Sequence, residues 1–203
     1  MIATLRALAL TGLLVFPGAA LAQSQTEAEA ETSAEGNNAT GLSMGTADGE
    51  PQVGSTYALS EHGDWQLRCV KTENGQDPCQ LYQLLADGDG NSVAEFSIFN
   101  LPEGQQAIAG ATVVTPLETL LTAQLRIQVD AGQARRYPYS FCSQAGCFAR
   151  VGFTADEVDA FKAGNAGKVL IVPAAAPDQT VQLTLSLTGF TAGWNALLEA
   201  NQQ

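Results

Sequence analysis

Apolar and polar residues alternate along much of the chain after residue 60. In Asp64–Val70, Trp65, Leu67 and Cys69 fall on one face and polar residues on the other, which is the period of a half-buried β-strand. Similar runs are separated by turn-forming clusters such as ENGQDP and DGDGN. The pattern predicts strands at Asp64–Val70, Cys79–Ala86, Ser92–Asn100, Ala107–Thr115, Thr122–Asp130, Ala134–Cys142, Cys147–Phe153, Lys168–Pro173 and Thr180–Leu187.

Two short segments have the signals of helices instead. Thr154 and Glu157 have the spacing of a capping box, in which each residue hydrogen-bonds the backbone of the other at the start of a helix. In the helix that follows, Val158 and Phe161 would face the sheet. A second helix is expected over Thr191–Ala200, where apolar residues recur at helical spacing.

Many short strands separated by turns favour antiparallel pairing over a fold that alternates strands with helices. We therefore predict an all-β fold. The expected architecture is an antiparallel β-sandwich or barrel-like sheet with one or two short helices, stapled by disulfide bonds.

The N-terminus has the features of an export signal. Arg6 precedes an apolar run that ends at Phe16, and Ala20-Leu21-Ala22 is a small-residue cleavage site, so residues 1–22 are predicted to be a signal peptide. The apolar run is shorter than the roughly 18–20 residues that span a bilayer. Because no later segment is long and apolar enough, we expect no stable membrane span after signal cleavage, and a periplasmic or secreted location.

Residues 23–56 contain no aromatic residue and are dominated by Ala, Glu, Ser, Thr and Gly. Such a segment cannot bury enough apolar surface to offset the entropy of ordering, so it is predicted to be a disordered acidic linker. The remaining residues, 57–203, have the length of a single domain with a sizeable core.

The chain carries 21 acidic and 9 basic residues, a net charge of −12. Nucleic-acid binding needs clustered Lys and Arg, so we expect no nucleic-acid partner. The same charge disfavours adsorption to anionic lipid.

Four cysteines, Cys69, Cys79, Cys142 and Cys147, lie in a chain predicted to be exported, which indicates disulfide bonds. Four cysteines allow three pairings. The four residues between Cys142 and Cys147 can turn a hairpin that brings the two within bridging distance. Cys69 and Cys79 end and begin neighbouring predicted strands. We therefore predict the pairs Cys69–Cys79 and Cys142–Cys147.

Two chemical roles for the cysteines are less favoured. A redox pair typically has a C-x-x-C spacing at the start of a helix, which lowers the thiol pKa. A four-thiolate zinc site would need closer spacing than the nine residues between Cys69 and Cys79. We expect no cofactor and no metal site.

Hydrolytic chemistry has little support. The only histidine is His62, and no G-x-S-x-G motif presents a nucleophilic serine. Catalysis by paired carboxylates needs only Asp and Glu, so the sequence leaves it open. Asp87 and Asp89 loosely resemble a calcium loop but lack its downstream Glu, and a turn explains them. We predict that the protein is not an enzyme.

A group of basic and aromatic residues flanks the Cys142 hairpin. Arginine and aromatic residues are enriched at protein interfaces. The alternative is a strand whose tyrosines fill the core while its arginines face solvent. The candidate interaction patch consists of Arg135, Arg136, Tyr137, Tyr139 and Arg150.

Several short motifs, taken in order, resemble one protein family. They are Gly63-Asp64-Trp65 with Cys69, Cys79-Gln80-Leu81 with Gln83, Cys142, Gly146-Cys147-Phe148, and Ser186-Leu187-Thr188-Gly189-Phe190 leading into TAGWNAL. In this order and spacing, residues 61–200 resemble the invasion-associated locus B family of exported alphaproteobacterial proteins. The long acidic linker departs from the family pattern.

The resemblance implies an exported, β-rich domain with structural disulfide bonds and no enzymatic residues to carry over. The family is named for a member linked to the entry of bacteria into host cells. We therefore expect a non-enzymatic envelope protein that acts on an unknown protein partner in the envelope or on a host surface. The alternative is a small-ligand-binding or enzyme-inhibitor module of the periplasm.

Overall fold

Antiparallel strands make up most of the computed structural model, which describes residue 49 and residues 51–202. The predicted signal peptide and most of the predicted linker lie outside these residues. The elements are β1 (Thr56–His62), β2 (Trp65–Val70), β3 (Cys79–Ala86), β4 (Ser92–Asn100), β5 (Ala109–Thr115), the 3₁₀ helix η1 (Leu121–Ala123), β6 (Leu125–Val129), β7 (Arg135–Tyr137), β8 (Phe141–Ser143), β9 (Gly146–Phe153), α1 (Ala155–Ala163), β10 (Ala166–Ile171), β11 (Val181–Ser186) and α2 (Phe190–Ala200).

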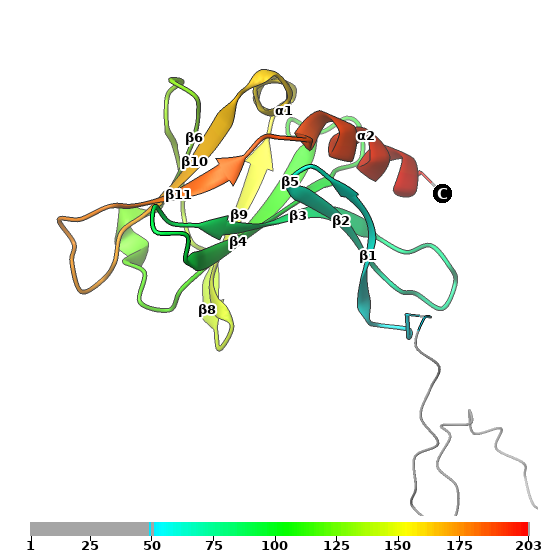
Figure 1. Cartoon of the computed structure of the whole chain (residues 1–203), viewed down its shortest axis with the longest axis horizontal. Coiled ribbons are helices and arrows are strands. Elements are labelled where there is room, and N and C mark those ends of the chain that lie inside the picture. Colours follow the sequence, from blue (N-terminus) through cyan, green and yellow to red (C-terminus); the bar gives the residue numbers. More distant parts are fainter. Residues whose placement is uncertain (1–48, 50, 203) are drawn as a thin grey trace, which may run out of the picture. The chain divides into compact units, whose positions relative to one another are not determined.

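The described strands form one sheet with the order β7-β6-β10-β11-β3-β4-β5-β9-β8, to which β2 and β1 are joined at β3. The sheet curls, and both helices lie on the same side of it (Figure 1). Tyr137 of β7 packs against Phe153 of β9 with ring centroids 6.1 Å apart, although these two strands are not paired within the described sheet. The barrel-like alternative is therefore confirmed, as a curled and incompletely closed sheet.

The core fills the side of the sheet that the helices cover, which we call the inner face. Trp65, Leu67 and Cys69 are each buried, as the alternation of β2 predicted. Aromatic rings connect the helices to the sheet, because Phe190 of α2 lies 5.3 Å from Trp65 and 5.5 Å from Phe161 of α1 between ring centroids. Aromatic contacts of this kind add to the stabilisation from buried area.

Both predicted helices are present. Thr154 caps α1, its hydroxyl accepts the Glu157 backbone N–H at 3.4 Å, and the Glu157 carboxylate accepts the Thr154 N–H at 2.9 Å. Val158 and Phe161 are buried, as the helical spacing predicted. The second helix begins one residue before the predicted start, at Phe190.

Both predicted disulfides are present, Cys69–Cys79 and Cys142–Cys147. Each joins directly opposed residues of neighbouring antiparallel strands, β2 with β3 and β8 with β9. Because each closes a short loop, each should stabilise the fold by roughly 2–3 kcal/mol.

The prediction of one strand over Ala134–Cys142 was wrong. The segment forms two strands at opposite ends of the sheet path, since Tyr137 pairs with Leu125 of β6 whereas Phe141 pairs with Phe148 of β9. Pro138 lies between the two strands, and a proline has no N–H to continue a ladder.

Strand β1 was not predicted from the sequence; it pairs with β2 and contains a register shift between Ala58 and Ser60. This irregularity interrupts the alternation that marks a strand. The predicted linker extends too far, because the Gly54 N–H donates to the Lys71 carbonyl at 2.8 Å and the Lys71 N–H donates to the Ser55 carbonyl at 2.9 Å. The ordered domain therefore begins before residue 56.

Two glycines allow the β1–β2 turn to touch the turn that leads into α2. Gly189 has φ +84°, and a Cβ there would lie 2.1 Å from the His62 carbonyl oxygen. Gly63 has φ +60°, and its Cβ would lie 2.6 Å from the Thr188 carbonyl oxygen. Such backbone-to-backbone contact leaves no space for a side chain.

The buried amide of Gln83 joins the same region. Its side-chain oxygen accepts the Ser186 N–H at 2.7 Å, and its nitrogen donates to the carbonyls of Ser186 and Asp64 at 3.1 and 3.2 Å. Trp65 also donates its indole N–H to the Ser186 carbonyl at 2.9 Å. These bonds connect β2, β3 and β11 where the edge of β3 is shared between two strands.

Among the described residues, no helix is long and apolar enough to cross a membrane.

Candidate functional site

The residues of the predicted interaction patch occupy separate places. Arg135 and Arg136 lie exposed on β7, and Tyr137 and Tyr139 are partly buried against the core. Arg150 lies on β9, where it pairs with Thr112 of β5. The curled sheet brings β7 near the inner face of β9, whereas Arg150 points to the opposite face. The structure therefore divides the patch into two sites.

The first site is on the outer face, the side of the sheet that faces away from α1 and α2. Phe141 of β8 stacks on Phe148 of β9 with ring centroids 4.7 Å apart and planes 10° apart. The Arg150 guanidinium carbon lies 5.6 Å from the centre of the Phe141 ring, within the range of a cation–π contact. Arg150 forms no ion pair within the described part of the chain.

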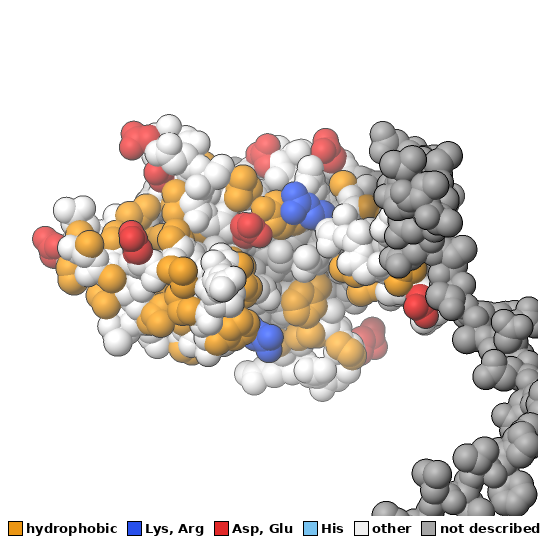
Figure 2. Space-filling view, turned by 90° about the horizontal axis from the view of Figure 1, so that it is seen from below, with side chains coloured by type: hydrophobic (Ala, Val, Ile, Leu, Met, Phe, Trp, Pro, Cys, Tyr) orange, Lys and Arg blue, Asp and Glu red, His pale blue; other side chains and the backbone are white. Residues whose placement is uncertain are grey.

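These two rings continue into a row across five strands, which we call the outer-face strip. Strand register places Phe141 beside Phe148, Phe148 beside Val114, Val114 beside Glu95, and Glu95 beside Leu84. Leu84 is 49% exposed and Phe141 is 45% exposed. Figure 2 looks at the molecule from this side and shows patches of hydrophobic side chains separated by uncharged polar surface, with acidic and basic groups among them. With strands about 4.8 Å apart, the strip is about 20 Å long.

A groove of about 440 Å³ adjoins the strip. Gly110 and Gly152 are cross-strand partners and form its floor, while Phe99 and Arg150 are among the residues that line it. The Phe99 ring covers Gly110 so closely that a Cβ at residue 110 would lie 2.6 Å from the ring.

A second arginine lies on the outer face. The Arg68 guanidinium carbon is 3.3 Å from the centre of the Tyr82 ring, and Arg68 also donates two hydrogen bonds to the Gln66 side chain. Burial, together with the charge of Glu95, raises the pKa of Tyr82. The outer face thus combines several arginines with exposed apolar side chains in an acidic protein, since the alternation of β6 and its register with β7 place Arg126 and Arg136 on it as well.

The second site lies between β7 and α1, and we call it the α1 pocket. Arg135 forms an ion pair with Glu157 of α1 at 3.0 Å, and the Tyr137 hydroxyl donates to the same carboxylate oxygen at 3.4 Å. Burial, followed by the negative charge of Glu157, raises the pKa of Tyr137 to about 12. The adjoining cavity has a volume of about 510 Å³.

Unlike Arg135 and Tyr137, Tyr139 has a structural role. Its hydroxyl lies 3.4 Å from that of Thr115, which is itself buried, and burial raises the pKa of Tyr139. The alternative reading in which tyrosines of this segment fill the core therefore describes Tyr139 well. Arg136 is exposed and faces Arg126 across the β6–β7 ladder.

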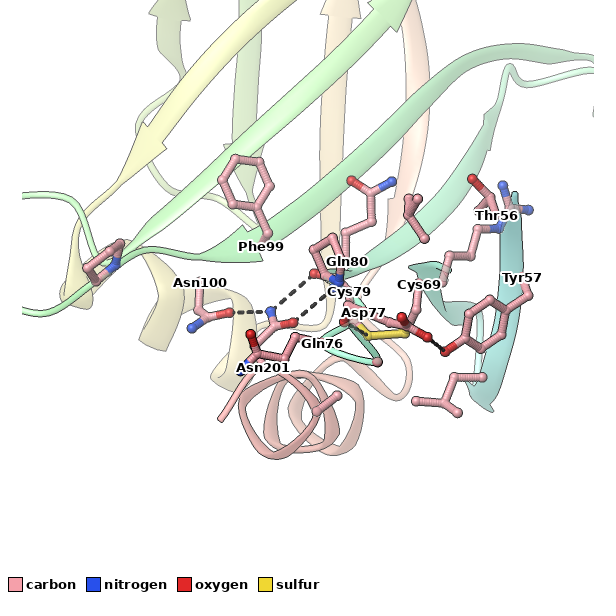
Figure 3. Close-up of a pocket in the computed structure, with 17 residues that line it drawn as sticks. Thr56, Tyr57, Cys69, Gln76, Asp77, Cys79, Gln80, Phe99, Asn100 and Asn201 are labelled. Atoms are coloured by element: carbon pink, nitrogen blue, oxygen red, sulfur yellow. Dashed lines mark hydrogen bonds between the residues drawn. A yellow bond between two sulfur atoms is a disulfide. The ribbon is translucent and has the colours of Figure 1, made fainter. Parts of the chain in front are cut away.

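A third hollow, of about 890 Å³, lies where β1, β2 and the end of α2 meet (Figure 3). One wall is held by Asn201, whose side chain accepts the Cys79 N–H at 2.9 Å and donates to the Cys79 carbonyl at 3.1 Å and to Asn100 at 2.6 Å. These bonds attach the C-terminal end of α2 to the Cys69–Cys79 disulfide. The polar groups on this wall therefore have a structural role.

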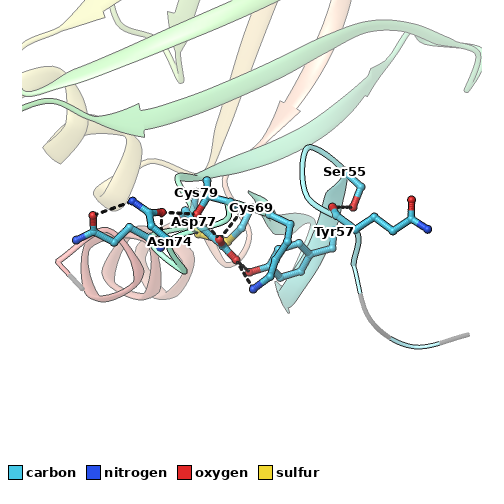
Figure 4. A network of polar contacts seen from close by, with 10 residues as sticks. Ser55, Tyr57, Cys69, Asn74, Asp77 and Cys79 are labelled. Carbon is cyan, nitrogen blue, oxygen red and sulfur yellow. Dashed lines mark hydrogen bonds and ion pairs between the residues drawn. A yellow bond between two sulfur atoms is a disulfide. The ribbon is translucent and has the colours of Figure 1, made fainter. Parts of the chain in front are cut away.

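Asp77 organises the loop on the other side of that hollow (Figure 4). Its carboxylate accepts the Thr72 N–H at 2.7 Å, the Tyr57 hydroxyl at 2.8 Å and Lys71 at 3.3 Å. The Thr72 N–H, followed by the Tyr57 hydroxyl, lowers the pKa of Asp77 well below its ordinary value, and the same bond to Asp77 raises the pKa of Tyr57. From the sequence, Asp77 was only one residue of the predicted turn ENGQDP.

The only histidine contacts a serine. The Ser60 hydroxyl lies 2.9 Å from Nε2 of His62, and both residues lie on the edge strand β1. Neither residue lines any of the three cavities described above. Within the described residues, no group of three or more His, Cys, Asp or Glu side chains is placed to hold a metal ion.

The sequence contained a usable signal for the outer-face strip. A disulfide between Cys142 and Cys147 requires both side chains on one face of the hairpin, so their neighbours Phe141 and Phe148 must share the other face. Leu84 and Val114 could not be added in this way, because their place in the row depends on the register of β3, β4 and β5.

Comparison with known proteins identifies the family. The sequence profile described as "Invasion associated locus B (IalB) protein" matches residues 65–198. The crystal structure of invasion associated protein b from Bartonella henselae is similar, with a TM-score of 0.60 and 22% identity over 71% of this chain and 98% of that chain. At this identity the structural likeness concerns the fold. No curated protein matches the chain. Because the profile covers well over half of the sequence, this chain belongs to the invasion associated locus B family.

Proposed function

We propose that this protein is exported to the bacterial envelope or beyond, catalyses no reaction, and acts by binding another protein through the outer-face strip. The export signal predicted at 1–22 supports the location. The Bartonella henselae relative is titled invasion associated, and this supports a protein of the envelope or of a host surface as the partner.

The observation that carries the proposal is the apolar part of the outer-face strip, Phe141, Phe148 and Val114, which Glu95 separates from the exposed Leu84. Single exposed apolar side chains are normal on protein surfaces, but a contiguous apolar patch marks an interaction site. Here two stacked phenylalanines continue directly into Val114 across paired strands. Aromatic residues flanked by arginine are the composition found at the centres of protein interfaces.

Charge indicates the chemistry of the partner. Arg150 lies beside the strip and Arg68 lies on the same face, whereas Glu95 is the only acid in the row itself. A partner that places an aromatic or aliphatic side chain near Phe141, next to a carboxylate for Arg150, would complement this surface. The groove beside Arg150 could accept that side chain.

The motif residues shared with the family support a structural role over a catalytic one. Gly63, Gly189 and Gln83 hold turns and strands together, and Trp65 lies in the core. The Ser60–His62 contact lies outside the described cavities. If Ser60 were a nucleophile, the protein would react with serine-directed fluorophosphonate probes and Ser60→Ala would abolish the labelling, an outcome that would refute the non-enzymatic proposal.

Photo-crosslinking in the source bacterium tests the protein-contact proposal. A benzoylphenylalanine residue placed at Phe141 or at Leu84 should crosslink the same protein, because both positions lie in the outer-face strip. Adding Arg150→Glu should reduce the yield at both positions, since it reverses the charge beside the strip.

Matched control positions are Ala192 and Glu199, which are exposed on α2 on the opposite side of the sheet. They should not crosslink that protein. Crosslinks of equal yield from α2 and from the strip, or none from the strip, would contradict the proposal.

A further inference from the structure

The α1 pocket exists because the sheet does not close. Strands β7 and β9 approach each other without pairing, and α1 lies across the gap between β6, β7 and the end of β9. The cavity of about 510 Å³ falls within the range of about 300–1,000 Å³ that holds small molecules.

The walls of the α1 pocket are mainly apolar. Ile127 and Val129 of β6 face Ala160 and Phe161 of α1, and Phe153 of β9 contributes an aromatic ring. The Phe153 and Phe161 rings are in edge-on contact with centroids 5.1 Å apart, which fixes this wall. Such walls favour the apolar part of a ligand.

The rim of the pocket is negative. Asp130, Asp156 and Glu157 contribute three carboxylates, and Arg135 is the one basic residue that lines the cavity. Arg135 is already paired with Glu157 at 3.0 Å. An anionic ligand would have to displace that ion pair and approach two further carboxylates, whereas a cation would be attracted by three carboxylates and repelled by Arg135 alone.

The three carboxylates differ in the number of hydrogen bonds and ion pairs that they accept. Asp130 accepts the backbone N–H groups of Asn165 and Ala166 at 3.1 and 3.0 Å, and Glu157 accepts Arg135 and the α1 cap. Asp156 is exposed on the first turn of α1. Its carboxylate can therefore reorient toward a bound cation.

We propose that the α1 pocket binds a small amphipathic cation, an apolar ring or short chain that carries a protonated amine. The apolar body lies against Phe153, Phe161 and Ile127. The ammonium group lies at the rim near Asp156, and the Tyr137 ring is among the residues that line the same cavity. This site is separate from the outer-face strip, so its failure would leave the proposed function standing.

An NMR titration of the purified protein tests the proposal with three probes that share one body. Phenethylamine is the cation, phenethyl alcohol the neutral match and hydrocinnamate the anion. Phenethylamine should shift the backbone amides of residues 127–137 and 153–164 and should bind more tightly than the other two.

Two variants and one control define the site. Ala160→Phe fills the cavity and should abolish binding of phenethylamine. Asp156→Asn should weaken it by about twofold to fivefold, the effect of losing one partly exposed charge pair. Asp159→Asn removes the same charge from the same helix outside the pocket lining and should leave the affinity unchanged.

The proposal is overturned if hydrocinnamate binds as tightly as phenethylamine, if the shifted amides lie outside the pocket, or if Asp159→Asn weakens binding as much as Asp156→Asn. Ala160→Phe could disturb the packing of α1, which its amide spectrum would show. In that case the comparison of Asp156→Asn with Asp159→Asn decides the outcome.

Discussion

At the residue scale, Asp77 shows how a polar side chain in a loop can stabilise the fold. It holds Thr72, Tyr57 and Lys71 together beside the Cys69–Cys79 disulfide. These hydrogen bonds need the ionised carboxylate, and they lower its pKa in the folded state.

The resulting pH dependence can be measured. Because the folded-state pKa of Asp77 is lowered, its contribution is fully present above the unfolded-state value of about 3.9 and is lost as the pH falls toward the folded-state pKa. In urea unfolding between pH 7 and pH 2, Asp77→Asn should lower the stability at pH 7 and flatten its decline below about pH 4. Asp178→Asn, at an exposed loop position, should leave the wild-type profile in place.

Substitution of Gly189 should also lower the stability of the fold. Gly189→Ala places a Cβ at φ +84° and 2.1 Å from the His62 carbonyl oxygen, so the β1–β2 turn must move. The free energy of unfolding should fall by about 2 kcal/mol or more. Gly88→Ala has open space around its Cβ and should change stability by less than about 0.5 kcal/mol. Equal stability of the two variants in chemical denaturation would show that the turn contact is not needed.

Single residues were predictable where a local pattern decides their environment. The period-2 alternation found the buried face of β2, and the capping box found the start of α1. The burial of Gln83 was not predictable, because its partners Asp64 and Ser186 come from distant segments. A polar residue becomes acceptable in a core only when such partners are in place.

At the scale of elements, the two disulfides should differ in their resistance to reduction. Cys69 and Cys79 are both buried, whereas Cys142 is exposed beside buried Cys147. A reductant must reach one sulfur of a bond, so limited dithiothreitol without denaturant should open Cys142–Cys147 first. Peptide mapping after alkylation identifies which cysteines react. Faster labelling of Cys69 and Cys79 would show that their region opens more easily than the hairpin.

The division of Ala134–Cys142 into two strands shows the limit of local patterns. Apart from Pro138, the residues of the segment suit a strand, so the sequence could predict extended conformation but not the partners of each part. Leu125 and Phe148 provide those partners, and they lie at opposite ends of the sheet path. Strand pairing over such distances depends on the whole topology.

At the scale of the whole molecule, the all-β class and the barrel-like alternative followed from the number of short strands. The candidate patch did not survive as one surface, because curling of the sheet turned Arg135 and Tyr137 toward α1 and left Arg150 on the outer face. The outer-face strip is assembled from five strands and is therefore a property of the topology.

If the outer face binds a protein partner, the affinity of the crosslinked partner for purified variants should depend on the residues of the outer-face strip. Phe141→Ser and Arg150→Glu should each weaken binding by about tenfold or more, as expected for residues at the centre of an interface. Arg136→Glu reverses an exposed arginine of β7, at the opposite end of the sheet path from β8, and serves as the matched control. The account predicts loss of affinity for the two outer-face variants with unchanged thermal unfolding and no loss for Arg136→Glu. Wild-type affinity in both outer-face variants, or an equal loss in Arg136→Glu, would contradict it.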